Sequence, residues 1–326
     1  MARVLELTAG ALLERLSGGF ADADLVDPAG VVVVLTPDGP TPQVAPRVGL
    51  LPAVVAGPPP LAAMADVVPE SDADLEAVIA AVGAHPLAAT ALAMLLRHSE
   101  SRSVADGLLA ESAVYSTLQG GPEFAAWRAG RPHRDGSLEE GPAVLCERDG
   151  PRLEIRLNRP ERRNALSARM REELLDALTV AALDDTVAEV HLRGEGPSFC
   201  SGGDLDEFGT FPDPATAHLV RVGRSAGAAI HAVTDRVVAH LHGSCVGSGI
   251  ELAAFAGRVL AAPDTTIALP EVDFGLVPGA GGTVSLPRRI GRHRTALLAL
   301  ARRSIDARTA LAWGLVDDLE GETTPT

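Results

Sequence analysis

Two glutamates in apolar surroundings are the residues of this chain whose types and spacing best suit acid–base chemistry. Glu251 lies in GSGIELA, where a helix is expected to begin, and Glu271 lies in IALPEVDFG, directly after an expected strand. Burial disfavours a charged carboxylate, so it raises the carboxyl pKa and allows proton transfer near neutral pH. Two such groups that face one water molecule suit a syn addition, with one acting as base and the other as acid. The alternative is a pair of structural acids, one of them stabilised by a helix dipole.

Three glycine-rich turns could supply backbone N–H groups that bind a ligand or an oxyanion. They read SFCSGGDL (198–205), GSCVGSGIEL (243–252) and PGAGGT (278–283), and the first two follow expected strands. Small residues let a ligand approach the backbone, and free N–H groups at the start of a helix can stabilise an oxyanion. No turn matches G-x-x-x-x-G-K-[ST] or G-x-G-x-x-G, so the pattern does not indicate a nucleotide-phosphate site. Each turn taken alone could equally be an ordinary chain reversal.

A thiol and two histidines offer rival chemistry. Cys245 stands in GSCVG between an expected strand and an expected helix, the position of the nucleophile in an α/β-hydrolase. Such an enzyme needs a downstream histidine, and only His293 follows the turn, in a basic helix start expected on the surface. His240 and His242 form an H-x-H pair on a strand, but no third metal ligand stands nearby. Packing histidines, and no metal site, are therefore expected.

The composition argues against several classes of protein. The chain of 326 residues is 46% hydrophobic but only 3% aromatic, which predicts an aliphatic core and disfavours a protein that stacks bases. A formal net charge of −15 without a basic tract also argues against a nucleic-acid partner. Three widely spaced cysteines fit neither a disulfide framework nor a zinc site, and the N-terminus lacks the apolar run of a signal peptide. No apolar stretch reaches about 18 residues, so no membrane span and a cytoplasmic location are expected.

The hydrophobic pattern divides the chain into two regions, 1–138 and 139–326. The first is expected to hold a small segment with a strand, VVVVL (31–35), followed by helices over 72–98, 104–119 and 123–129, the first of them broken at Gly83 and Pro86. A polar, turn-rich linker covers 128–142. The second region alternates strands and helices, which predicts a largely parallel α/β architecture. Its expected helices cover 170–185, 215–233 and 250–256, and its expected strands include 186–194, 236–242, 258–263 and 265–270.

Five blocks of the second region carry a resemblance to a known superfamily. In chain order they are LNRPERRNALS (157–167), GPSFCSGGDLDEF (196–208), HGSCVGSGIELA (242–253), LPEVDFGLVPGAGGT (269–283) and ARTALAWGLVDD (307–318). Their order and spacing resemble the crotonase (enoyl-CoA hydratase/isomerase) superfamily over about residues 143–320. The resemblance implies an α/β fold with a crotonase-like ββα superhelix core around a pocket for a CoA thioester. The N-terminal region would be an additional, largely helical part.

The resemblance implies a role for each matching residue. The backbone N–H groups of Gly203 and Ser248 would form the oxyanion hole, although the family usually has glycine at the second position. Glu251 would activate water for attack on C3, and Glu271 would protonate C2. Isomerases often keep only the second acid, so the presence of both favours hydration. The residues expected to bind the substrate are Arg162, Arg163, Ala165, Ser201, Gly202, Asp204, Leu205 and Gly247.

The implied function is reversible syn hydration of a 2-enoyl-CoA, or dehydration of a 3-hydroxyacyl-CoA. CoA would be part of the substrate, so no separate cofactor is expected. The same fold also serves isomerases, hydrolases, decarboxylases and oxygenases, and fold does not fix function. A non-catalytic acyl-CoA-binding partner protein is a further alternative. Asp204 and Asp206 are expected to form a charge pair at a helix start, and Asp206 stands where many relatives have a lysine that could meet CoA phosphate.

The chain departs from the superfamily pattern at both ends. The usual sequence continues beyond the block at 307–318 in helices that cover the active site and build a trimer. Here the stretch DLEAVIAAVGAHPLAATALAMLLRH and the following GLLAESAVYSTLQ, within residues 72–129, resemble that tail but precede the core. We therefore expect the N-terminal helices to replace the missing cap, in a permuted or duplicated arrangement. An unrelated helical domain is the alternative, and a homo-oligomer, trimer or hexamer, is implied by the family.

Overall fold

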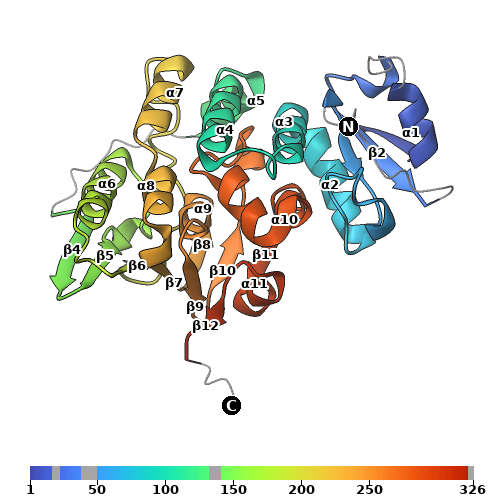
Figure 1. Cartoon of the computed structure of the whole chain (residues 1–326). Helices are drawn as coiled ribbons and strands as arrows, with labels where there is room; N and C mark the ends of the chain where they lie inside the picture. The colour runs from blue at the N-terminus through green and yellow to red at the C-terminus, as the bar shows by residue number, and fades with distance from the viewer. Residues whose placement is uncertain (17–22, 38–49, 132–140, 322–326) are drawn as a thin grey trace, which may run out of the picture.

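The computed structural model describes residues 1–16, 23–37, 50–131 and 141–321 (Figure 1). The expected α/β architecture is confirmed. In the N-terminal region the helices and strands are β1 (Arg3–Thr8), α1 (Ala9–Leu16), β2 (Val31–Thr36), β3 (Val54–Ala56), α2 (Asp72–Ala84), α3 (Pro86–Arg97), α4 (Val104–Gln119) and α5 (Pro122–Ala129). Most of the linker expected over 128–142 lies outside the described residues.

The second region holds the main sheet and the helices around it. Its strands are β4 (Val144–Asp149), β5 (Arg152–Leu157), β6 (Glu189–Gly194), β7 (Val237–Leu241), β8 (Ser244–Val246), β9 (Arg258–Ala261), β10 (Thr266–Ala268), β11 (Ser304–Asp306) and β12 (Asp318–Leu319). Its helices are α6 (Ala168–Leu183), α7 (Pro214–Gly223), α8 (Ala226–Ala232), α9 (Ser248–Ala253), α10 (Gly282–Leu300) and α11 (Ala307–Trp313), with the short 3₁₀ helix η6 (Glu271–Phe274).

The strands of the second region form two sheets that lie next to each other. The larger has the order β12-β9-β7-β6-β5-β4, parallel except for the β4–β5 hairpin. The smaller has the order β11-β10-β8. An isolated bridge joins Cys200 to Cys245 on β8, so the turn at 198–203 lies beside the turn at 243–248. Two glycine turns that are far apart in the sequence therefore meet.

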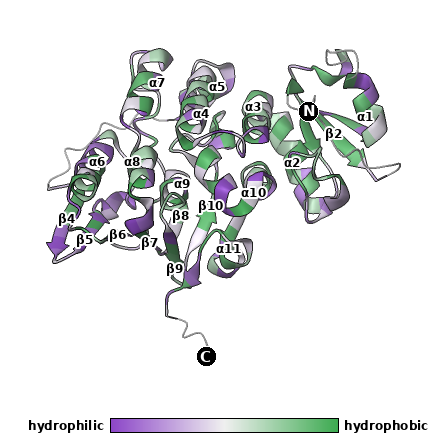
Figure 2. Cartoon of the chain, in the orientation of Figure 1, coloured by the Kyte–Doolittle hydropathy of each residue, from purple (hydrophilic) through white to green (hydrophobic). Residues whose placement is uncertain are grey.

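A third sheet, in the N-terminal region, is parallel with the order β1-β2-β3. Side chains alternate between the two faces of a strand, and both faces of β2 are covered. Val31 and Val33 belong to a small apolar cluster with α1, whereas Val32 belongs to the main core. Figure 2 shows the resulting hydrophobic strand, in contrast to the edge strand β4, whose last half is hydrophilic.

The main core is continuous between the two regions. Val78 on α2 and Leu92 on α3 are fully buried in the same apolar cluster as Ile267 on β10 and Leu297 on α10. Helix α4 lies between α3 and α7 and contacts α10, as Figure 1 shows. Helices α2–α4 are thus held against the second region by burial of apolar surface, not by surface contacts alone.

Two predicted helix boundaries were wrong. The expected helix at 215–233 is divided, because the Ser225 side chain accepts a hydrogen bond from the Ala228 N–H and starts α8 anew. The break in 72–98 falls at His85, before Pro86, and Gly83 stays helical. In the described part of the chain, no single helix is long and apolar enough to cross a membrane. Among the described residues, one bent pair passes that test by length and composition: α2 together with Pro86–Leu96 of α3, at a bend of 117°.

Candidate active site

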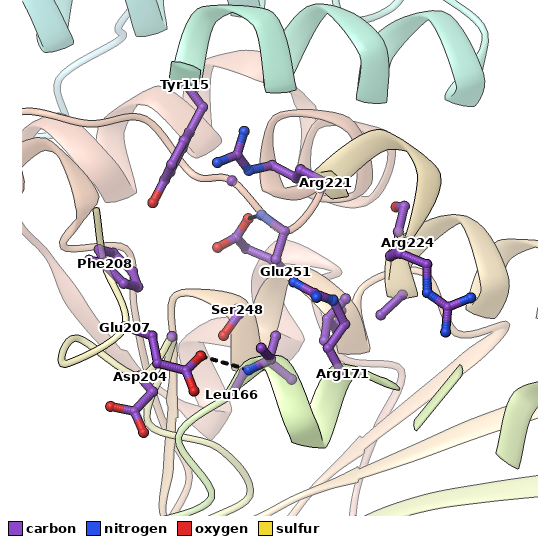
Figure 3. A pocket seen from close by; sticks show the side chains of 18 of the residues that line it. Tyr115, Leu166, Arg171, Asp204, Glu207, Phe208, Arg221, Arg224, Ser248 and Glu251 are labelled. Carbon is purple, nitrogen blue, oxygen red and sulfur yellow. Dashed lines mark hydrogen bonds between the residues drawn. The ribbon is translucent and has the colours of Figure 1, made fainter. Parts of the chain in front are cut away.

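One pocket of the described structure is lined by most of the candidate catalytic residues. It lies between α4, the turns at 203–209 and 278–281, and the N-terminal end of α9. Figure 3 shows Tyr115 reaching down from α4 toward the space that Glu251 and Ser248 face from other elements. The charged and hydroxyl-bearing residues that line the pocket include Glu111, Tyr115, Arg171, Asp204, Glu207, Arg221, Arg224, Ser248, Glu251 and Glu271.

Glu251 is held by the glycine turn at the start of α10. Its side chain is buried, and Oε2 accepts the N–H of Ala280 at 2.7 Å and that of Gly282 at 2.8 Å. A Cβ at Gly282 would lie 2.6 Å from Glu251 Cγ, so only glycine permits this approach. Burial raises the pKa of Glu251 to about 7, against the lowering effect of the two N–H donors. The group can therefore act as a base near neutral pH.

Glu271 begins η6 and is buried, with 7% of the residue exposed. Its Oε2 has no hydrogen-bond partner among the residues that the structure describes. Burial, followed by the charge of Glu251, raises the pKa of Glu271 well above its ordinary value. The pocket thus contains two neighbouring carboxyls, Glu251 and Glu271, whose pKa values are both raised by burial.

The two candidate oxyanion donors line the same pocket. Gly203 and Ser248 are brought together because the turn at 198–203 pairs with β8, and Gly203 also bridges to Leu166. Ser248 is the first residue of α9, where the N–H has no partner within the helix. Among the described residues, neither N–H has a hydrogen-bond acceptor in the protein. Both donors are free to bind an oxygen atom in the pocket.

Asp204 lines the pocket, but its carboxylate belongs to an ion pair. Oδ2 lies 2.8 Å from Nη2 of Arg159, and both side chains are largely buried. Asp206 pairs with Arg162 at 3.2 Å and with Arg131 at 3.7 Å. The prediction that the two aspartates form a charge pair at a helix start was wrong, because they lie in a turn and bind arginines.

The remaining residues predicted to bind substrate stand beside the pocket but do not line it. The loop at 159–165 contacts the oxyanion turn, since the Ser201 N–H donates to the Arg163 carbonyl at 3.0 Å. Gly247 has a positive φ of 50° next to Glu271. The predicted residues outside the lining are Arg162, Arg163, Ala165, Ser201, Gly202, Leu205 and Gly247.

The rival readings of the thiol and the histidines find no support. Cys245 is fully buried, which raises the pKa of its thiol well above the ordinary value. His293 is half-buried, not exposed as predicted, and Nε2 hydrogen-bonds the Ala62 carbonyl in the N-terminal region at 2.9 Å. His240 contacts Glu320 and His191, while His242 Nε2 lies 3.0 Å from the Gly196 carbonyl. In the described ranges, no group of three or more His, Cys, Asp or Glu residues is placed so that it could hold a metal ion.

Two lining residues of α4, Glu111 and Tyr115, were not predicted from the sequence. Glu111 is a third buried carboxyl, and burial together with the charge of Glu251 raises its pKa to about 8. Arg221 on α7 lies over the Tyr115 ring, with its guanidinium carbon 4.2 Å from the ring centroid. The available signal was an acid inside the otherwise apolar stretch GLLAESAVY (107–115).

Comparisons with known proteins agree on the second region. A family model described as Enoyl-CoA hydratase/isomerase matches residues 151–324. A 2,3-dehydroadipyl-CoA hydratase of Escherichia coli (strain K12) is 34% identical over 176 residues, which are 54% of this chain and 68% of that protein. An enoyl-CoA hydratase structure from Thermoplasma volcanium GSS1 is similar, with a TM-score of 0.52, 35% identity, and coverage of 56% of this chain and 73% of that chain. One from Mycobacterium smegmatis has a TM-score of 0.52, 29% identity, and coverage of 55% and 70%.

Proposed function

Because this chain belongs to the enoyl-CoA hydratase/isomerase family, we propose that it adds water reversibly across the C2–C3 double bond of a 2-enoyl-CoA. The crotonase resemblance and the crotonase-like α/β fold are confirmed, and the chain is an enzyme of the hydratase type. The observation that carries the proposed reaction is the pair of buried carboxyls, Glu251 and Glu271, whose pKa values are both raised and which line one pocket with two unpaired N–H donors.

In the proposed mechanism the thioester oxygen accepts the N–H groups of Gly203 and Ser248. These donors stabilise the negative charge that develops on the oxygen when C3 is attacked. Ionised Glu251 takes a proton from water as the water oxygen bonds to C3, and protonated Glu271 gives its proton to C2. The two acids exchange protonation states in the forward direction, and a proton transfer through solvent restores them. Dehydration runs through the same steps in reverse.

The reaction is tested by hydration of crotonyl-CoA, followed as loss of enoyl-thioester absorbance. Glu251→Gln and Glu271→Gln each keep the shape of the side chain and remove its acid–base function, so each should lower kcat by about 10²- to 10⁴-fold. Cys245→Ala is the control and should retain turnover, because the thiol is buried and takes no part. Full activity in either glutamine variant would exclude the two-acid mechanism.

The acyl group is a separate question, and the substrate panel should address it. The Escherichia coli relative is named for 2,3-dehydroadipyl-CoA, so this thioester belongs beside crotonyl-CoA and longer 2-enoyl-CoA esters. Comparison of kcat/KM across the panel identifies the preferred acyl chain. Binding of CoA esters without turnover of any of them would favour the alternative of a non-catalytic partner protein.

The N-terminal helices are part of the proposal, as the cap of the pocket. Helix α4 contributes Leu108, Glu111, Tyr115 and Gln119 to the lining. Helix α5 packs on η6, which carries Glu271, with the rings of Trp127 and Phe274 centred 5.0 Å apart. These contacts support the idea that the helices of 72–129 replace the family's C-terminal cap.

The homo-oligomer and the cytoplasmic location stay predictions, to be tested by light scattering and by cell fractionation.

A further inference from the structure

Two carboxylates share the four backbone N–H groups of the turn at 280–283. Glu251 accepts the N–H groups of Ala280 and Gly282 at 2.7 and 2.8 Å. Glu111 accepts those of Gly281 and Thr283, at 2.7 and 2.8 Å. The donors therefore alternate along the chain, and the turn lies between a carboxylate of α9 and a carboxylate of α4.

Both oxygens of Glu111 are engaged by this turn. Oε1 takes the Gly281 N–H, and Oε2 takes the Thr283 N–H together with the Thr283 hydroxyl at 2.7 Å. The residue is 2% exposed, so water does not substitute for these donors. One helical turn further along α4, Tyr115 covers Gly279, where a Cβ would lie 2.5 Å from the ring. Helix α4 thus fixes the turn at two points.

We infer that Glu111 is a positioning residue for Glu251. By holding the Gly281 and Thr283 amides it fixes the turn, and the intervening amides of Ala280 and Gly282 then keep the Glu251 carboxylate in place. The kinetic consequences rest on the proposed hydration, but the geometric role does not. The N-terminal region would then contribute to catalysis through a defined contact, beyond covering the pocket.

Several charged groups face Glu111 and set its electrostatic surroundings. Glu251 on α9 and Glu271 on η6 interact with it, as do Tyr115 on its own helix and Arg221 on α7. To the extent that Glu111 is ionised where Glu251 titrates, a purely electrostatic role for Glu111 would raise the pKa of Glu251 through repulsion between like charges. A positioning role has the opposite effect, because the N–H groups that it orders stabilise the charged form of Glu251. The two roles can therefore be distinguished by the sign of one pKa shift.

The test is Glu111→Gln, with kcat measured between pH 5 and pH 9. The amide group of glutamine brings N–H donors toward the amides of the turn, so the turn should loosen. We expect kcat to fall about 10- to 100-fold with little change in KM, since small displacements of a catalytic group cost this much. We also expect the acid limb of the pH profile, where kcat rises as Glu251 loses its proton, to move to higher pH by about half a unit to one unit. A limb that stays in place or moves to lower pH would overturn the inference.

Glu123→Gln is the matched control for this substitution. Glu123 also lies in the N-terminal region and accepts two amides at the start of a helix, those of Leu87 at 2.7 Å and Ala88 at 3.1 Å. Its carboxylate does not contact the turn at 280–283. The control should keep kcat within about twofold and leave the acid limb unchanged. If it moved the limb as Glu111→Gln does, the effect would be a general one of the region and the inference would fail.

Two further measurements keep the inference testable. If Glu111→Gln does not fold, Thr283→Val removes only the hydroxyl donor to Glu111 and should shift the acid limb in the same direction by a smaller amount. A carboxyl-carbon NMR titration of Glu251 in the full chain measures its pKa without turnover. A higher Glu251 pKa in the variant, in a protein that hydrates no enoyl-CoA, would support the positioning role and reject the proposed function. An unchanged Glu251 pKa in the variant of an enzyme that does hydrate enoyl-CoA would reject the positioning role and support the proposed function.

Discussion

Gly247 leaves no space for a side chain beside Glu271: a Cβ at Gly247 would lie 2.3 Å from Oε1 of that carboxyl. The positive φ of 50° at Gly247 adds a backbone reason for glycine. The residue was predicted to bind substrate, but in the structure it sets the position of an acid.

Gly247→Ala should therefore displace Glu271 and lower kcat by about 100-fold, since a misplaced catalytic group costs roughly this factor. L residues rarely adopt the backbone conformation of Gly247, with φ 50° and ψ −122°, so the substitution should also cost about 1–3 kcal/mol of unfolding free energy. Gly150→Ala is the control, because Gly150 has a φ of 56° and nothing within 4 Å of a Cβ. It should show the loss of stability without the loss of kcat. Equal activity of the two variants would refute the steric argument.

The pH profile of kcat should have two limbs. The acid limb should rise through pH of about 7, because Glu251 must lose its proton to act as base and burial raises its pKa to that value. The alkaline limb should fall at higher pH, since Glu271 must keep its proton, and burial, followed by the charge of Glu251, raises its pKa. Initial rates at saturating crotonyl-CoA measure both limbs, which belong to the coupled acids as a group. A rate that is flat from pH 5 to pH 8 would contradict the assignment of the base.

Glu271→Gln should stabilise the fold more at pH 8 than at pH 5. The pKa of Glu271 is raised in the folded state, so its stabilising contribution is present at low pH and is lost as pH rises toward that pKa. Each unit of the shift corresponds to about 1.4 kcal/mol, and glutamine does not titrate. Thermal unfolding of both proteins at the two pH values gives the comparison. A gain in Tm that is the same at both values would mean that Glu271 is not perturbed in the fold.

The cap proposal predicts that the peptide link between the two regions is dispensable. A protease site inserted within residues 132–140 should allow complete cleavage with kcat retained within about twofold. The shared apolar core and the partly buried Arg303–Asp74 ion pair, at 2.7 Å, should keep the pieces together. A chain that lacks residues 1–130 should instead be inactive. Release of the N-terminal piece with full activity of the remainder would show that α4 and α5 are not the cap.

Local sequence patterns predicted the helices that have clear ends. The bounds expected for α4 agree with the structure, because Ser103 caps its first turn and Gly120 follows its last residue. The pattern could not show which element α4 contacts, so the role of Glu111 in the pocket was not foreseen. Strand β8 was also missed, since it has only three residues between two glycines and is stabilised by pairing with β10.

The candidate site was predicted in part, because the sequence blocks identify residues but do not show their tertiary contacts. Glu251, Glu271, Gly203 and Ser248 were expected in one pocket from the five blocks, and the structure places them there. The arginines were harder to interpret, because a charged residue in a turn can bind a substrate or a neighbouring carboxylate. Arg162 turns toward Asp206, a pairing that depends on tertiary contacts between residues 44 positions apart.

Helix α4 covers a pocket that is built almost entirely from residues that follow it in the chain, which bears on the order of synthesis. At about 5–20 residues per second, a ribosome needs roughly 10–30 s to proceed from Gln119 to the turn at 280–283. During that time Leu108 and Tyr115 lack the pocket surface that they face, and Glu111 has none of its three donors from Gly281 and Thr283. The newly made N-terminal region must therefore keep an apolar face soluble until the second half emerges, which makes it a natural client for a chaperone.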